Sequence, residues 1–512
     1  MKRITTLLLA VAFTLGSVCA AQADGIDIKV KGQWDFAFGW VNNRHFKDNA
    51  NSSNPSRRRS GINNGQVRDN DNFEARQRVR VQINFITSEY LQGLLHFEIG
   101  DLDWGRTTGG TARAARHTGG GLDADGVNIE TKRAFIDWMI PNTPVSVRMG
   151  IQGLKLPSTR MGSPVFDTDV AGIVVSSPIT DWMSITGFWI RPFDAYANDG
   201  WDESFSDEVD AFGLIVPLDF NGFKFSPWFI YGFVGANSGI YDYLYTGSFN
   251  NTVTAQNSRT HVWWAGMTFD MTFFDPLKLS VEGIYGRLSQ ADLTGFGGLE
   301  KYGQATSVNQ GTQGWYIGAT LDYKLSWGTP GIFGWYASGD DANSDHSGKM
   351  GRLPVLGTDG GSSFKPTSFG THGYYGIGNG NNSVLVTGTG TGTWGVGIQL
   401  ADVSFIEDLS HTLRFAYYRG TNDSDLVRKG GDFFGYNGDS LYLTNDDSVF
   451  EVNFDHKYKI YENLTAVLEL GYLHLSSDKS TWRRYNNSYG RHKDMEETDD
   501  AWKAEINFRY EF

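Results

Sequence analysis

Residues 26–40 read IDIKVKGQWDFAFGW, and this stretch alternates strictly between two faces. Side chains in a β-strand point to opposite sides in turn, so the alternation predicts a strand with one face in lipid and the other in water. The apolar face carries Ile26, Ile28, Val30, Gly32, Trp34, Phe36, Phe38 and Trp40. The opposite face carries Asp27, Lys29, Lys31, Gln33, Asp35, Ala37 and Gly39.

The last residues of the chain repeat this pattern. Trp502, Ala504, Ile506, Phe508, Tyr510 and Phe512 alternate with Lys503, Glu505, Asn507, Arg509 and Glu511. A half-buried strand of a soluble sandwich also alternates, but it rarely keeps so many large apolar residues on one face over more than twice the usual strand length. The final aromatic residue resembles the terminal signal of barrels inserted into the bacterial outer membrane. Both ends therefore predict a transmembrane antiparallel β-barrel.

The N-terminus has the layout of a secretory signal peptide. Lys2 and Arg3 precede an apolar stretch at 4–18, and Ala21-Gln22-Ala23 is a small-x-small cleavage site. The apolar stretch is too short to span a bilayer as an anchor. We therefore expect residues 1–23 to be removed and residues 24–512 to form a single barrel. Cys19, the only cysteine, leaves with the signal, so the mature chain has no disulfide.

The composition favours a barrel over a helical membrane protein. The chain has 34 Phe, 23 Tyr and 16 Trp, yet its mean hydropathy is −0.35. After the signal no apolar run approaches about 18 residues, which excludes transmembrane helices. A soluble all-β sandwich, propeller or solenoid is the alternative. Removing Lys2 and Arg3 from the 44 basic residues leaves 42 against 58 acidic ones, a net charge of −16 that argues against nucleic acid as a partner.

Connection lengths test the barrel independently, because bacterial barrels alternate short periplasmic turns with long outer loops and have an even strand count. We predict a strand at 169–177, long loops such as 41–71, and a largest loop at about 340–391. With that strand the short turns alternate with long loops throughout, giving 18 strands and periplasmic termini; 16 strands is the alternative. The lumen is then wide enough for a channel. The predicted short turns lie near residues 87–88, 141–144, 178–181, 219–222, 273–276, 326–329, 406–410 and 461–463.

Six segments carry a family resemblance, at residues 30–40, 76–85, 92–105, 132–138, 149–157 and 333–341. They resemble the outer-membrane homotrimeric porins of sulfate-reducing bacteria and, more distantly, the general trimeric porins. The resemblance implies a trimer in a Gram-negative outer membrane and passive diffusion of small hydrophilic solutes and ions. The predicted partners are outer-membrane lipid and lipopolysaccharide, two further copies of the chain, and those solutes. General porins usually have 16 strands, whereas 18 strands are seen in sugar-specific channels.

A row of three arginines is the sharpest candidate for function. Arg76, Arg78 and Arg80 share one face of a predicted strand whose other face is apolar apart from Gln77. The apolar face must meet lipid, where a midplane arginine costs about 2–4 kcal/mol, so the arginines are expected to project into the lumen about 7 Å apart. In trimeric porins a basic wall of this kind faces acids on an inward loop, and the transverse field orients permeating solutes.

Other lumen residues extend this hypothesis. Arg148 and Gln152 would add to the basic wall, and Asp167 and Asp169, near the third long loop, would be the facing acids. In the alternative interpretation the arginines only pair with Glu74, Glu98 and Glu130. The complete set of predicted pore-lining or constriction residues is Arg76, Arg78, Arg80, Arg148, Gln152, Asp167, Asp169, Glu98, Lys29 and Lys31.

Metal and enzyme functions have less support in the sequence. Asp340, Asp341, Asn343 and Asp345 form an acidic loop cluster that offers oxygen ligands for a structural Ca²⁺, but it lacks the spacing of an EF-hand. The ten histidines are scattered, and no Ser/His/acid trio falls on adjacent strand ends. The sequence therefore predicts a non-enzymatic diffusion porin. A sugar-type selective channel and a structural surface barrel are the alternatives.

Overall fold

The computed structural model describes most of the predicted strands and part of the long loops. The predicted signal peptide and most of the first two long loops lie outside the described residues. Within the described part of the chain, no helix combines the length and hydropathy needed to cross a membrane. The described residues are 25–42, 72–105, 129–194, 208–236, 238, 254–255, 259–294, 307–341, 348–356, 363–370, 390–425, 443–481 and 500–512.

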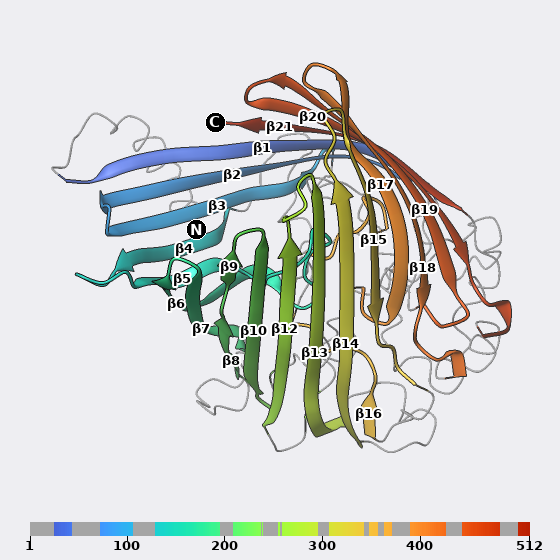
Figure 1. The fold of residues 1–512 in the computed structure, drawn as a ribbon, viewed down its shortest axis with the longest axis horizontal. Coiled ribbons are helices and arrows are strands. Elements are labelled where there is room, and N and C mark those ends of the chain that lie inside the picture. The colour runs from blue at the N-terminus through green and yellow to red at the C-terminus, as the bar shows by residue number, and fades with distance from the viewer. Residues whose placement is uncertain are drawn as a thin grey trace.

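The chain forms a closed antiparallel barrel of 18 strands (Figure 1). Each wall strand pairs with its neighbours along the chain, and β1 pairs with β21 to close the cylinder. The wall strands are β1 (Asp27–Asn42), β2 (Asn72–Ser88), β3 (Leu91–Asp103), β4 (Ile129–Met139), β5 (Ser146–Lys155), β6 (Asp167–Thr180), β7 (Met183–Asp194), β8 (Glu208–Ile215) with β9 (Leu218–Phe220), β10 (Phe223–Val234), β12 (Thr260–Met271), β13 (Leu277–Thr294), β14 (Ser307–Tyr323), β15 (Thr329–Ala337), β17 (Thr393–Ile406), β18 (Leu409–Gly420), β19 (Ser448–Tyr461), β20 (Leu464–Ser476) and β21 (Ala501–Glu511).

Three short strands, β9, β11 (Thr254–Ala255) and β16 (Gly348–Met350), do not count as separate strands of the wall. β8 and β9 are one wall strand interrupted at Val216 and Pro217, because proline has no N–H to donate to the ladder. β11 extends the edge of β13, and β16 runs parallel to β14. Both belong to long connections, so the wall count stays at 18.

All eight predicted short turns are confirmed, and they lie at one end of the barrel. Five of them have only two connecting residues, and these join β2 to β3, β6 to β7, β9 to β10, β17 to β18 and β19 to β20. The strand predicted at 169–177 is also confirmed, as part of β6. Its presence keeps every short turn on the same end, which decides between 18 and 16 strands.

The outer face of the wall is apolar and rich in aromatic side chains. In β1, Trp34 and Trp40 are exposed, whereas Asp35 and Ala37 of the opposite face are buried inside the barrel. The register couples this facing to the next strand, since Trp34 pairs with Val79 and Asp35 pairs with Arg78. The lipid-out, water-in alternation predicted from the sequence is therefore the facing in the structure.

One hairpin of the wall leaves the cylinder and turns inward. Pairing between β4 and β5 ends at Ala134 and Ile151, and pairing between β6 and β7 begins only at Ala171. β5 and β6, however, remain paired with each other up to Lys155 and Asp167. Gly150, with φ of 133°, stands where β5 departs, a backbone conformation that side chains rarely adopt. The free two-stranded end carries the connecting loop 156–166, here named L3, into the barrel.

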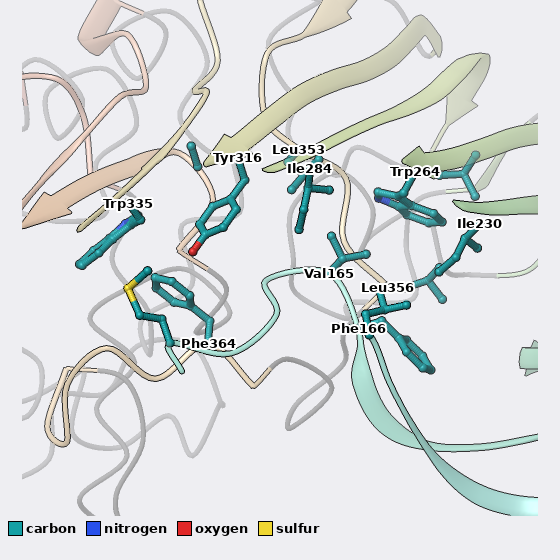
Figure 2. Packing of buried hydrophobic residues seen from close by; sticks show 14 of the residues in the cluster. Val165, Phe166, Ile230, Trp264, Ile284, Tyr316, Trp335, Leu353, Leu356 and Phe364 are labelled. Atoms are coloured by element: carbon teal, nitrogen blue, oxygen red, sulfur yellow. The ribbon is translucent and has the colours of Figure 1, made fainter. Parts of the chain in front are cut away.

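A second long connection also enters the barrel. This loop, named L7, joins β15 to β17, and its described segments include 351–356 and 363–370. Figure 2 shows Val165 and Phe166 of L3 and Leu356 and Phe364 of L7 among side chains of the barrel wall. The wall side chains of this cluster include Ile230, Trp264, Ile284, Tyr316 and Trp335, all buried. The apolar core of the protein therefore lies inside the barrel.

L3 and L7 are bonded to each other along their backbones. The N–H of Lys365 donates to the carbonyl of Met161 at 2.6 Å, and the N–H of Ser363 donates to the carbonyl of Ser163 at 3.2 Å. Between them lies Gly162, with φ of 83°, where an added Cβ would stand 1.8 Å from the carbonyl oxygen of Ser363. Only glycine allows the two loops to approach this closely.

We predict that Gly162→Ala separates L3 from L7 while the barrel stays folded. The left-handed backbone alone costs a side chain about 1–2 kcal/mol, which corresponds to about 10-fold faster proteolysis of L7 in the detergent-solubilised protein. The matched control is Gly187→Ala, because a Cβ at Gly187 meets no atom within 4 Å. Equal protease resistance of both variants, with unchanged heat-modified mobility on gels, would refute the role of Gly162.

Candidate solute pathway in the barrel lumen

The inner wall has an apolar part and a polar part. From β7 to β15 it presents buried apolar side chains, such as Ile190, Trp264 and Phe333, against which L3 and L7 pack. From β18 through β21 and β1 to β4 it presents charged side chains in alternation, such as Asp455 and Arg509. L3 and the described segments of L7 pack against this apolar part, whereas the polar part carries ion pairs.

The predicted arginine row lies on the polar part of the wall. Arg76 contacts Glu74 at 2.9 Å, Arg78 contacts Asp35 at 3.5 Å, and Arg80 donates to Glu98 at 2.6 Å. The pairing predicted with Glu74 and Glu98 is thus present.

The alternation pattern did not single out Asp35 as an acid of this row. Asp35 is fully buried where β21, β1 and β2 meet, and it accepts hydrogen bonds from Arg509 at 2.6 and 3.2 Å as well as from Arg78. A signal was available in the sequence, because Asp35 lies on the polar face of its strand beside Gln33. The pairing of β1 with β2 brings Arg78 to Asp35. Arg509 reaches it only through barrel closure, which pairs β1 with β21.

The inward hairpin presents acids, as predicted, but to different basic residues. Asp169 contacts Arg133 at 2.6 Å and Lys132 at 2.9 Å, and Asp167 contacts Lys155 at 3.2 Å. These cations belong to β4 and β5, so the acids do not pair directly with the arginine row. The acids face the lumen because the free end of the β5–β6 hairpin has left the wall. The opposite face of this hairpin packs against the wall.

The remaining predicted residues divide into three groups. Arg148 lies on the inner wall, paired with Asp137 at 2.6 Å and stacked over the Phe135 ring. Lys29 and Lys31 are exposed near the short-turn mouth. The expectation for Gln152 was wrong. Its side chain is buried, and its amide donates to the carbonyl of Gly172 at 3.0 Å, because it lies on the face of the hairpin that packs against the wall.

A second basic group was missed in the sequence. Arg160 of L3 donates to Asp322 at 2.9 Å, and Gln399 donates to the other oxygen of the same carboxylate at 3.2 Å. Gln399 pairs across the sheet with Arg414, which donates to Asp455 at 2.6 Å. The alternation of β18 could have placed Arg414 inside, but a loop residue such as Arg160 carries no facing signal.

One lysine of L7 also reaches this region. Lys365 is exposed into the lumen within electrostatic reach of Asp167, Glu469 and Lys155. Desolvation in the confined lumen lowers the pKa of Lys365, and the nearby Lys155 acts in the same direction, whereas Asp167 and Glu469 oppose the shift. L7 therefore places a cation opposite the acids of the inward hairpin.

In these ion pairs the basic side chain is more exposed than its acidic partner. The exposed fractions are 29% for Arg160 against 15% for Asp322, and 24% for Arg414 against 10% for Asp455. The same order holds for Arg80 with Glu98, Arg133 with Asp169, Arg148 with Asp137 and Arg509 with Asp35. The acids are thus the more deeply buried partners of these pairs, and the cations are the more exposed ones.

The first acid of the predicted calcium cluster, Asp340, is engaged in an ion pair. Asp340 is buried and contacts Arg352 at 2.9 Å, and its other oxygen accepts the N–H of Arg352 at 3.2 Å. Asp340 is thus engaged in fixing L7. Asn343 and Asp345 lie outside the described residues. Among the residues that the structure describes, no three His, Cys, Asp or Glu side chains are grouped to hold a metal ion.

The barrel architecture and its inward loops place the chain among the 18-stranded outer-membrane β-barrels. No protein-family model matches the chain, and no curated protein is similar to it in sequence. Among solved structures, Acinetobacter baumannii OccAB2 is similar, with a TM-score of 0.51 and 11% identity over 95% of this chain and 98% of that one.

Two Pseudomonas aeruginosa structures are also similar. OccK9 (OpdG) has a TM-score of 0.48 and 11% identity, with coverage of 95% and 98%. OccK2 (OpdF) in complex with glucuronate has a TM-score of 0.48 and 9% identity, with the same coverage. At these identities the likeness to OccAB2 establishes the fold alone.

We predict that Asp35→Asn destabilises the barrel strongly. It leaves Arg78 and Arg509 facing each other without their shared carboxylate, and removing one partner of a buried ion pair costs about 3–5 kcal/mol. The measurement is urea unfolding of the protein refolded in lipid, followed by tryptophan fluorescence. Asp27→Asn is the control, because Asp27 makes an exposed ion pair with Lys29. Equal midpoints for the two variants would contradict a central role of Asp35.

Proposed function

We propose that the protein is a substrate-selective outer-membrane channel for small anionic solutes. The observation that carries this proposal is the exposure order of the lumen ion pairs, in which the cations face the passage and the acids stand behind them. A guanidinium group that donates hydrogen bonds to an acid on one side keeps further N–H donors for a carboxylate or phosphate. The basic residues occur on L3, L7 and the polar wall, so an anion meets cations along its path.

The narrowing by L3 and L7 supports selectivity over free diffusion. Two unit charges about 4 Å apart interact by about 1 kcal/mol in bulk water and by about 4 kcal/mol at the lower effective dielectric near a protein surface. A solute in a wide pore stays beyond a Debye length of about 8–10 Å and is screened. Because two loops fill the barrel, the solute passes close to the arginines. At that distance the charge pattern distinguishes anionic solutes from others.

This proposal departs from the non-selective porin predicted first. It favours the selective alternative, with an anion in place of a sugar as the preferred solute. The homotrimer implied by the resemblance receives no support from the matched structures and stays a prediction. The proposed transport requires only residues of one chain. Insertion in the outer membrane and contact with its lipid follow from the fold and the apolar outer face.

The proposal predicts anion selectivity in planar bilayers. With a KCl gradient, the reversal potential of the purified protein should favour chloride over potassium, and glucuronate should reduce the chloride current in a saturable manner. We choose glucuronate because it is a small carboxylate, the ligand in the OccK2 complex. The variant Arg160→Gln/Arg414→Gln should lower the anion preference severalfold, because both exposed guanidinium groups beside Gln399 are lost.

Lys479→Gln is the control, since Lys479 is exposed in the long connection after β20. It changes the net charge without altering the lumen, so its reversal potential should equal that of the wild type. Cation preference of the wild-type protein, or an unselective conductance that glucuronate does not reduce, would contradict the proposal. In that case the non-selective porin would be the better interpretation.

A further inference from the structure

We propose that the tip of L7 (residues 367–370) is held by a fixed latch on β18–β21 and that this latch sets the size limit of the channel. The inference rests on the proposed channel function and adds the residues that determine solute size. The described parts of L7 contact two parts of the inner wall: Leu353, Leu356 and Phe364 join the apolar core, and residues 367–370 lie against the polar part.

Glu451 of β19 is the first part of the latch. One oxygen of its carboxylate accepts the backbone N–H groups of Phe369 and Gly370 at 3.1 and 3.0 Å and the amide of Asn453 at 2.8 Å. The other oxygen accepts the hydroxyl of Tyr418 at 3.0 Å. All these groups are buried. Two of these four hydrogen bonds bind the turn of the loop, and the two from Asn453 and Tyr418 hold the carboxylate in place on the wall.

Lys503 of β21 is the second part. Its ammonium donates at 2.7 Å both to the carbonyl of Ser368 and to the carboxylate of Glu469, and it lies 5.7 Å from the centre of the Phe369 ring. The side chains of Lys503 and Glu469 are fully buried. A buried lysine with no exposed surface cannot attract a solute directly. It joins the loop carbonyl of Ser368 to the wall carboxylate of Glu469, so its role is to position L7.

Ser368 connects the latch to the solute pathway. Its N–H donates to Asn453 at 3.3 Å, and its hydroxyl donates to Asp455 at 3.0 Å. The second oxygen of Asp455 accepts from Arg414, which is exposed to the passage. A loop that moved away from this wall would widen the passage and would also free the acid that orients Arg414.

Residues 367–370 of L7 also pack directly against the wall. Phe369 is fully buried, and a Cβ at Gly471 of β20 would stand 2.7 Å from the Cβ of Phe369. At Gly370, an added Cβ would stand 2.5 Å from the carboxylate of Glu451 and 2.4 Å from the hydroxyl of Tyr418. The absence of side chains at these two glycines lets the loop tip lie directly on the wall. Direct contact leaves no space for a solute on this side of L7.

The test compares latch variants with a matched control by exclusion of neutral polymers. Phe369→Ala removes the packed ring from the loop, and Lys503→Met/Glu469→Gln removes the buried pair. Lys324→Met is the control, an exposed lysine in the turn between β14 and β15. Each protein is reconstituted in planar bilayers and probed with poly(ethylene glycol)s of graded size, with heat-modified gel mobility reporting barrel folding.

Both latch variants should admit larger polymers than the wild type and raise the single-channel conductance at least twofold, whereas Lys324→Met should change neither. A folded barrel with an unchanged polymer cutoff in Phe369→Ala would overturn the latch. If the lysine–glutamate variant does not fold, Phe369→Ala and Glu451→Gln decide the question. A wild-type protein that conducts with cation preference would instead contradict the proposed function, while a changed cutoff would still support the latch.

Discussion

The backbone hydrogen bonds between β1 and β21 are the constraint on which the rest of the structure depends. The N–H of Gly32 donates to the carbonyl of Phe512 at 2.7 Å, and the N–H of Phe512 donates back to Gly32 at 3.0 Å. A bilayer offers no water to an unpaired strand edge, so a sheet spans it only when closed. Closure fixes the register at the seam, and that register brings Arg509 to the buried carboxylate of Asp35, which Arg78 of the neighbouring β2 also contacts.

Closure of 18 strands creates an interior too large for wall side chains to fill. The protein fills it with backbone: the end of the β5–β6 hairpin, L3 and L7. These segments bring apolar side chains to one part of the wall, and the polar part fixes L7 through Glu451 and Lys503. The interior therefore resembles the core of a soluble domain with a charged passage beside it. In the proposed channel, selectivity requires that these loops are packed in place.

Alternation predicted the wall accurately because lipid and water impose opposite demands on successive residues of every strand. It therefore identified the facing of Arg76, Arg78 and Arg80 and the turns at one end. It failed where a segment leaves the wall. Gln152 continues the alternation of β5, yet its strand has already turned inward, so the side chain is buried. Alternation also places Lys503 on the polar face of its strand, yet L7 covers this side chain.

The sequence by itself determined the barrel, its strand count and the inward position of the charged rows, because these depend on local periodicity and on connection length. Only the tertiary structure decided which long loops enter the barrel, which acid pairs with which arginine, and which charged side chains remain exposed. These features depend on contacts between residues such as Arg160 and Asp322, or Ser368 and Lys503, far apart in the chain. No local pattern encodes such pairs, because their contact follows from closure and loop packing.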